Sequence, residues 1–147
     1  MLLDLDETFL VRIGDIGSFI RDQGYLAYKT ANSGLATALA EDVTAPVVLV
    51  TSSGFLATDN PPEVLTANRA LLTRGYSLSL LPSAEKDDTV ATIVSRQMTR
   101  PFNAGVVREE ATARARFETY MAAGDLLVCS AAPPDAIAEA LMPHVLP

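Results

Sequence analysis

The stretch Met1-Leu-Leu-Asp-Leu-Asp-Glu-Thr-Phe-Leu-Val-Arg-Ile-Gly14 opens the chain and decides its fold class. Three apolar residues lead into Asp4 and Asp6, which alternate with Leu5. This alternation predicts a short buried strand with both carboxylates on one face near its carboxyl end, where open α/β sheets bind ligands. Two such carboxylates can share a divalent cation, or one can accept a proton from a substrate hydroxyl. In the plainer alternative, Asp6 or Thr8 caps the next helix.

Length and composition indicate one compact domain spanning residues 1–147. The chain is long enough to bury a core without disulfides or metal, and 49% of its residues are apolar, as in ordinary globular proteins. The net charge of -7 argues against non-specific binding to nucleic acid or to acidic membranes. We find no signal peptide or membrane-spanning run in the sequence, so the expected location is cytoplasmic.

The cysteine and histidine content excludes several kinds of site within the chain. Cys129 is the only cysteine, and it ends the apolar run Asp125–Cys129, which predicts a buried thiol rather than a nucleophile. His144 is the only histidine and lies near the C-terminus. These two residues cannot supply a Ser/His or Cys/His triad, nor a Cys/His zinc site.

Helical and strand patterns alternate along the rest of the chain. The run Val47–Val50 is typical of a strand covered on both faces. The alternation predicts a three-layer αβα fold with a short, mainly parallel sheet. Helices are expected over residues 9–20 (with a break near Gly14 and Gly17), 25–40, 63–73, 82–98, 109–122 and 133–142, and further strands over 47–50, 76–81 and 125–130.

Several short motifs occur in a fixed order along these elements. Over nearly its full length the chain resembles shikimate kinase, a small P-loop kinase of the nucleoside-monophosphate-kinase type, from that family's second strand to its last helix. The matching motifs are Asp4-x-Asp6 with Gly14; Gly24 followed by Tyr28-Lys29; the strand end Ser52-Ser53-Gly54; Arg100-Pro101 with Gly105; and Arg116 followed at four by Tyr120.

The resemblance implies an acceptor site for a small anionic hydroxy acid such as shikimate. It gives Asp4 the role of magnesium ligand, and Asp6 the roles of catalytic base and ligand of the shikimate hydroxyls. The resemblance assigns binding of the shikimate carboxylate to Lys29 and Arg116, since cations bind carboxylates through charge-assisted hydrogen bonds. The remaining implied substrate-binding residues form the glycine-rich loop of the family, here Ser52, Ser53 and Gly54.

The resemblance also implies ATP as phosphoryl donor, with magnesium as its cofactor. Arg100 corresponds to the lid arginine that reaches the phosphates and supports catalysis, and Arg96 is the second expected ATP contact. A mobile cation suits the charge that develops on a transferring phosphoryl group. In the plainer alternative, Arg100 and Arg116 are solvated cations at helix ends.

The chain departs from the family at the phosphate-binding loop. No Gly-x-x-x-x-Gly-Lys-Ser/Thr sequence occurs in it, and in the family the first strand, this loop and the first helix precede the position of Asp4. We therefore expect a fold without these three elements and phosphoryl transfer that is weak or absent. Ser52 and Ser53 replace glycines, and Lys29 replaces an arginine, losing its bidentate fork.

The missing strand is central in the family, so the sheet is expected to split between the strands that end at Val50 and Leu81 and to expose unpaired edges. Two explanations follow. The natural protein begins upstream of Met1, or the chain is a diverged, non-catalytic relative whose sheet is rearranged or completed in a homo-oligomer.

Two other functions compete with the kinase. The opening stretch also looks like the first motif of haloacid-dehalogenase-type phosphatases, with Asp4 as nucleophile, Asp6 as acid/base and Thr51 or Ser52 as phosphate-binding hydroxyl. That family also needs a lysine and an acidic pair on separate elements, whereas Lys86-Asp87-Asp88 is one run at a helix start. The third function is a regulatory or sensor domain that binds a small anion without catalysis.

Overall fold

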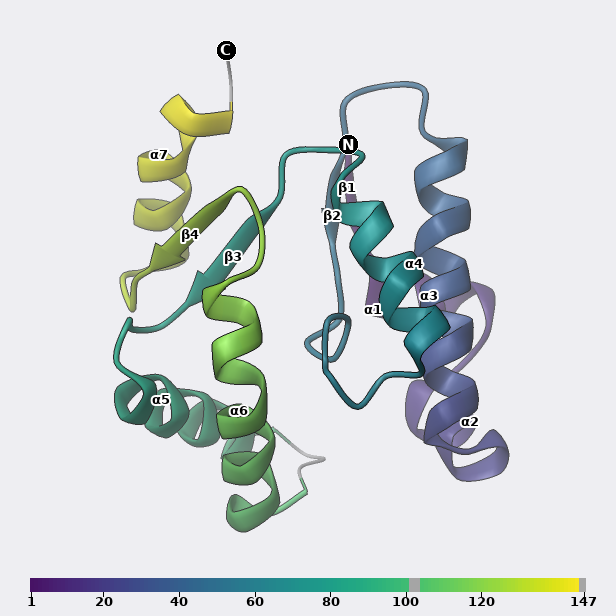
Figure 1. Cartoon of the computed structure of the whole chain (residues 1–147), viewed down its shortest axis with the longest axis horizontal. Helices are drawn as coiled ribbons and strands as arrows, with labels where there is room; N and C mark the ends of the chain where they lie inside the picture. Colours follow the sequence, from purple (N-terminus) through teal and green to yellow (C-terminus); the bar gives the residue numbers. More distant parts are fainter. Residues whose placement is uncertain (101–103, 146–147) are drawn as a thin grey trace. The chain divides into compact units, whose positions relative to one another are not determined.

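The computed structural model describes residues 1–100 and 104–145, and the chain divides into two compact units, Met1–Gly75 and Tyr76–Pro147. Each unit contains two parallel strands with helices around them (Figure 1), so the fold is α/β with short parallel sheets, as expected. The prediction that residues 1–147 fold as one domain stays a prediction. Within the described part of the chain, no helix is long and apolar enough to cross a membrane.

The first unit contains two strands and four helices. Its elements are β1 (Leu2–Asp4), α1 (Leu5–Arg12), α2 (Ile16–Gln23), α3 (Tyr25–Asp42), β2 (Val48–Val50) and α4 (Pro62–Leu72). The predicted break between two helical pieces is confirmed at Gly14, whereas Gly17 lies inside α2. α2 ends at Gln23, just before Gly24, which has φ +89°, a conformation that glycine adopts at little cost.

An aromatic cluster holds the first three helices together. Phe9 of α1 has no exposed surface, and its ring meets Phe19 of α2 edge-on at 5.4 Å between centroids and Tyr28 of α3 at 5.3 Å. Leu5 is equally buried one turn before Phe9. The core of this unit is therefore built mainly between helices.

The structure corrects the prediction for the opening stretch. β1 ends at Asp4 and α1 begins at Leu5, so Asp6 lies in the first helical turn and not on a strand beside Asp4. The reason is the N-cap: Asp4 Oδ1 accepts hydrogen bonds from the amides of Asp6 and Glu7, at 2.9 and 3.1 Å. The alternative that an opening polar residue caps the next helix is confirmed, but the capping residue is Asp4 rather than Asp6 or Thr8.

The sheet of the first unit is open on one face. β1 and β2 are parallel, with Leu2 opposite Val48 and Asp4 opposite Val50. Leu2, Val48 and Val50 are exposed, and Val48 keeps 63% of its surface accessible. The prediction that the strand at Val47–Val50 is covered on both faces is therefore wrong for this face, because an apolar run does not reveal how many layers cover it.

The second unit pairs its strands in the same parallel sense. Its elements are β3 (Leu78–Leu81), α5 (Lys86–Met98), α6 (Val106–Met121), β4 (Leu126–Cys129) and α7 (Pro134–Val145). The buried Ser79 of β3 donates its hydroxyl hydrogen bond to the carbonyl of Tyr120 at 2.6 Å, which ties the strand to α6. At the strand entrance, Asp125 accepts hydrogen bonds from the Ser77 amide and hydroxyl, which lower the pKa of its carboxyl.

Two further predictions in this unit are corrected. The helix expected from Pro82 begins only at Lys86, because the Thr89 hydroxyl donates to the Ser83 carbonyl and accepts from the Ser83 amide, which holds residues 82–85 outside the helix. Cys129 is exposed rather than buried: it is the last residue of β4, a strand whose ladder has β3 as its one partner among the described residues.

Phe9→Ala should destabilise the first unit strongly. The ring is fully buried between three helices, so its removal costs about 3–5 kcal/mol of unfolding free energy. Val11→Ala is the matched control, because Val11 lies on the same helix with 84% of its surface exposed, and it should change stability by less than about 0.5 kcal/mol. Urea unfolding followed by circular dichroism measures both, and equal effects would contradict the assigned core.

Gly124→Ala should destabilise the second unit, whereas Gly34→Ala should not. Gly124 has φ +81°, and a Cβ there would lie 2.9 Å from the Ser77 carbonyl oxygen, so the cost is about 1–3 kcal/mol. Gly34 lies inside α3 with nothing within 4 Å of an added Cβ, so alanine should stabilise by about 0.5–1 kcal/mol. Thermal unfolding of the two variants gives the signs, and destabilisation by Gly34→Ala would refute this assignment.

Candidate functional site

The predicted site residues fall into two sets, one in each unit. The first unit carries the two aspartates, Lys29 and the loop at residues 52–54, and the second unit carries the three arginines. The first set is Asp4, Asp6, Lys29, Ser52, Ser53 and Gly54, and the second is Arg96, Arg100 and Arg116.

Lys29 is the best-defined charged group of the first set. It projects from α3, and its side chain is only 6% exposed. Its ammonium nitrogen lies 2.8 Å from the backbone oxygen of Asp59, 2.8 Å from Asp59 Oδ1, and 4.9 Å from the centroid of the Tyr25 ring. Burial of a charge is tolerated only with such compensation, and the aromatic ring adds a cation–π contact. Lys29 is thus a cation held in place inside the first unit.

The loop after β2 is fixed against this unit by buried asparagines. Asn60 Nδ2 donates to the carbonyls of Gly54 and Phe55, at 3.1 and 3.0 Å. Asn68 of α4 donates to the same Phe55 carbonyl at 2.7 Å and accepts the Ser33 hydroxyl at 2.6 Å. The side-chain amides of Asn60 and Asn68 are buried, and each donates to a backbone carbonyl of the loop (residues 51–60). These hydrogen bonds hold the loop backbone in one conformation.

The predicted substrate loop contacts α3 directly. The Ser52 hydroxyl donates to Asn32 Oδ1 at 3.1 Å, and Asn32 lies one turn beyond Lys29. Ser53 is exposed, and Gly54 is half-buried, with its carbonyl accepting the Ala57 amide at 3.1 Å. The structure therefore brings Ser52 and Lys29 to the same part of the first unit.

The two aspartates lie at the carboxyl edge of the β1–β2 sheet. Asp4 pairs in register with Val50, immediately before the loop that begins at Thr51, so Asp4 and the substrate loop share this edge. Asp6 is exposed in the first turn of α1. Because β1 and β2 are parallel and in register, their carboxyl ends lie side by side, and Asp4 therefore lies next to the start of the loop.

The described carboxylates do not form a complete magnesium site on their own. Asp4 already uses Oδ1 as a helix cap, and among residues 1–100 and 104–145 no three His, Cys, Asp or Glu side chains form a metal-binding group. Magnesium bound by one or two carboxylates normally also needs substrate phosphates.

The three arginines of the second unit occupy different elements. Arg96 is exposed in the last turn of α5, Arg100 is exposed just after that helix, and Arg116 is half-buried on α6. Pro101, which completes the Arg100-Pro101 motif, lies outside the described residues. The structure does not bring these arginines to the acceptor residues within one unit.

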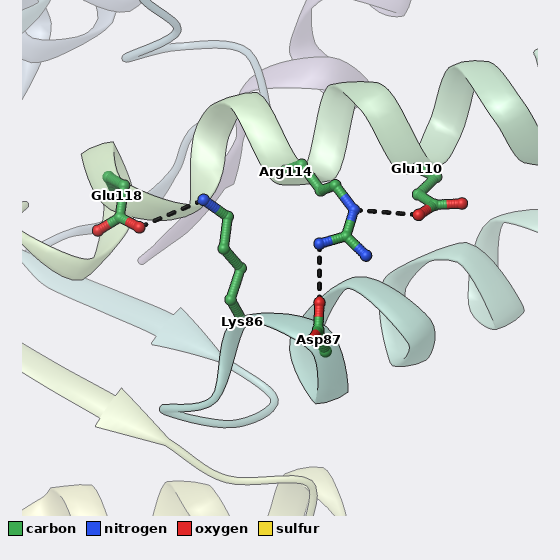
Figure 2. Close-up of polar contacts among 5 residues, drawn as sticks. All are labelled: Lys86, Asp87, Glu110, Arg114 and Glu118. Carbon is green, nitrogen blue, oxygen red and sulfur yellow. Dashed lines mark hydrogen bonds and ion pairs between the residues drawn. The ribbon is translucent and has the colours of Figure 1, made fainter.

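A network of ion pairs joins α5 to α6 (Figure 2). Arg114 lies 2.7 Å from Asp87 Oδ1 and 3.0 Å from Glu110 Oε1, and these hydrogen bonds raise the pKa of its guanidinium. Lys86 pairs with Glu118 at 3.3 Å. Asp87, Glu110 and Arg114 also line a shallow groove of about 180 Å³. Lys86 and Asp87, part of the single run that does not meet the phosphatase requirement, are thus engaged in contacts between helices.

Sequence reasoning missed the residues that organise this site. Asp59 and Asn60 lie between the strand expected over residues 47–50 and the helix expected over 63–73. Asn32 and Asn68 are polar residues on helices, where solvent exposure is the usual state. The one available signal was the turn-forming run Asp59-Asn60-Pro61, which favours a tight, side-chain-bonded loop.

Asn68→Ala should loosen the loop and destabilise the first unit. It removes the partner of two buried groups, the Ser33 hydroxyl and the Phe55 carbonyl, which costs about 1–3 kcal/mol. Thr66→Ala on the exposed side of α4 is the control and should cost less than about 0.5 kcal/mol. Urea unfolding and limited proteolysis at residues 51–60 measure the two effects, and an unchanged cleavage rate in Asn68→Ala would count against the anchoring role.

The comparisons with known proteins support one fold. No protein-family model and no curated protein match the chain. Among solved structures, shikimate kinase from Aquifex aeolicus matches with a TM-score of 0.69 and 17% identity, over 96% of this chain and 78% of that one. Shikimate kinase from Acinetobacter baumannii, in complex with shikimate, matches with a TM-score of 0.68 and 16% identity, over 99% of this chain and 80% of that one. The chain therefore has a shikimate-kinase-like P-loop kinase fold.

Proposed function

We propose that this chain binds a small hydroxy acid of the shikimate class in its first unit, with Lys29 as the cation for the ligand carboxylate. The observation that carries the proposal is the buried ammonium group of Lys29, held beside the substrate loop at residues 52–54. An apolar and aromatic surrounding strengthens the attraction of a cation for a carboxylate relative to water. The fold shared with a shikimate-bound kinase supports the same ligand class.

The hydroxyl groups of the ligand are proposed to face the edge of the β1–β2 sheet. Asp6 is the proposed acceptor of a hydroxyl proton there, and Ser52, Ser53 and Gly54 are the proposed loop contacts. Asp4 is the proposed ligand of a magnesium ion brought by the phosphoryl donor. The resemblance assigns a second cation for the ligand carboxylate to Arg116, and that role stays a prediction because Arg116 belongs to the second unit.

Phosphoryl transfer from ATP is the proposed ancestral chemistry of the fold, and we propose that it is weak or absent in this chain. Arg96 and Arg100 are the proposed phosphate contacts, but the sequence contains no Gly-x-x-x-x-Gly-Lys-Ser/Thr loop. Backbone amides and the lysine of such a loop supply most of the electrostatic support for the transfer. The second candidate function, a non-catalytic small-anion-binding domain, is favoured by this same observation.

Shikimate and Mg-ATP should give different results in calorimetric titrations. We expect shikimate to bind and Lys29→Met to weaken it at least tenfold, about 1.4 kcal/mol, because the carboxylate loses its cation. Lys86→Met, which removes the other lysine of the chain, should leave the affinity unchanged. Mg-ATP should give little or no heat.

Other outcomes separate the competing functions. Shikimate-dependent ATP turnover would establish a kinase despite the missing loop. Hydrolysis of p-nitrophenyl phosphate that is lost in Asp4→Asn would favour the phosphatase. If folded wild-type protein gives no heat with shikimate or related hydroxy acids, the proposed ligand class is wrong.

A further inference from the structure

We propose that Asn32 sets the hydrogen-bonding direction of the Ser52 hydroxyl, so that this hydroxyl meets a ligand as an acceptor and not as a donor. The Ser52 position then selects a ligand that offers a hydroxyl proton there over one that offers a bare carbonyl or phosphate oxygen. The direction rests on the geometry of Asn32, whereas the ligand class rests on the proposed function. Asn32 is thus a positioning residue, because it acts on a ligand through Ser52.

Asn32 presents a buried amide to the loop at residues 51–60. It lies on α3, one turn beyond Lys29, and keeps only 3% of its surface exposed. Its Oδ1 lies 3.1 Å from the Ser52 hydroxyl, and its Nδ2 lies 3.5 Å from the hydroxyl of Tyr28, one turn earlier on the same helix. The oxygen is therefore the end of the amide that faces Ser52.

The chemistry of the amide oxygen determines which group donates. An amide oxygen has lone pairs but no proton, so the Ser52 hydroxyl is the donor of its hydrogen bond with Asn32. A serine hydroxyl has one proton and two lone pairs. Because the proton is directed at Asn32, the hydroxyl has only lone pairs to offer a ligand.

Reversal of this direction is unfavourable because Asn32 is buried. Across residues 1–100 and 104–145, no buried side-chain nitrogen or oxygen lacks a hydrogen-bond partner, and the Ser52 hydroxyl is the partner shown for Asn32 Oδ1. If Ser52 turned its proton to a ligand, the buried amide oxygen would lose this donor, which is costly away from water. The ligand therefore has to supply the proton.

The backbone that carries Ser52 is itself held in place. Ser52 is half-buried, and its carbonyl accepts the Phe55 amide at 3.0 Å. The Phe55 carbonyl in turn accepts from the side chains of Asn60 and Asn68. The Ser52 hydroxyl thus has a fixed origin as well as a fixed direction. Such preorganisation lets a difference between ligand groups appear as a difference in affinity.

This direction predicts which ligand groups the loop accepts. A ligand hydroxyl can donate to Ser52, whereas a keto oxygen or an unprotonated phosphate oxygen has only lone pairs and would face those of Ser52. Ser52 is therefore unsuited to the phosphate-binding role that the phosphatase hypothesis gives to Thr51 or Ser52. The proposed hydroxy acid fits, because its hydroxyls are donors and its carboxylate has a separate cation in Lys29.

A first test measures the direction without any ligand. In ¹³C,¹⁵N-labelled protein, Ser52→Ala should move the side-chain carbonyl carbon resonance of Asn32 upfield, because the amide oxygen loses its donor, and should shift the Nδ2 protons little. Thr30→Ala, which removes an exposed hydroxyl from the same helix, is the control and should move neither. A carbonyl carbon that stays in place, or an Nδ2 proton that moves instead, would overturn the proposed direction.

A second test compares ligands of equal charge by calorimetry. Shikimate and analogues in which one hydroxyl at a time is replaced by a keto group carry the same carboxylate, so the interaction with Lys29 cancels in the ratio of their Kd values. We expect one keto analogue to bind roughly tenfold more weakly than shikimate, and this ratio to fall to about threefold or less in Ser52→Ala and in Asn32→Leu. The double variant should lower the ratio no further, because Asn32 acts through Ser52. Thr30→Ala should keep the wild-type ratio.

The outcomes separate this inference from the proposed function. A merely structural role for Asn32 would weaken binding of shikimate and keto analogue equally and leave the ratio unchanged, which would overturn the inference. Ser52→Ala keeps the test decisive if Asn32→Leu does not fold. If folded wild-type protein gives no heat with shikimate or its keto analogues while the Asn32 carbonyl resonance moves as expected, the ligand class is wrong and the assigned direction stands.

Discussion

A buried positive charge must be compensated, and the burial of Lys29 imposes this constraint on the first unit. An ammonium group taken out of water costs several kcal/mol unless acceptors replace its hydration. The chain meets that requirement with a residue thirty positions away in the sequence, Asp59, and with the ring of Tyr25. The loop after β2 must therefore return to α3, and the asparagine contacts of Asn60 and Asn68 fix the path by which it does so.

The order and type of the elements could be read from the sequence because local signals were strong. The helical periodicity over residues 9–20 and the apolar run at Val47–Val50 each predicted an element. The motifs spread along the chain also led to the fold that the solved shikimate kinases share with it. These features depend on neighbours a few residues apart, which a sequence displays directly.

The failures arose where two local signals competed or where burial depended on distant elements. Asp4-Leu5-Asp6 fits both the alternation of a strand and the start of a capped helix. In the structure Asp4 is the N-cap of α1, and Asp6 lies in the helix. Pro82 begins many helices, but the hydroxyl of Thr89 holds that segment in a loop. The exposure of Cys129 and Val48 depends on which layers surround a strand, and an apolar pattern carries no information on that.

The candidate site shows the same division between local and distant information. Lys29 and the loop at residues 52–54 were found from motifs, whereas Asp59 and the buried asparagines become visible only when the loop, α3 and α4 are packed together. The roles of Arg96, Arg100 and Arg116 stay predictions, because these residues belong to the second unit.

The division of the chain at Gly75 has a consequence for synthesis. Every contact described around Lys29 is made between residues 1 and 75, so none of them waits for the second unit. Domains generally fold as units while the chain leaves the ribosome at about 5–20 residues per second. The contacts around Lys29 can thus form before the whole second unit has emerged from the ribosome. The first unit would then be packed on a nascent chain whose second unit is still incomplete.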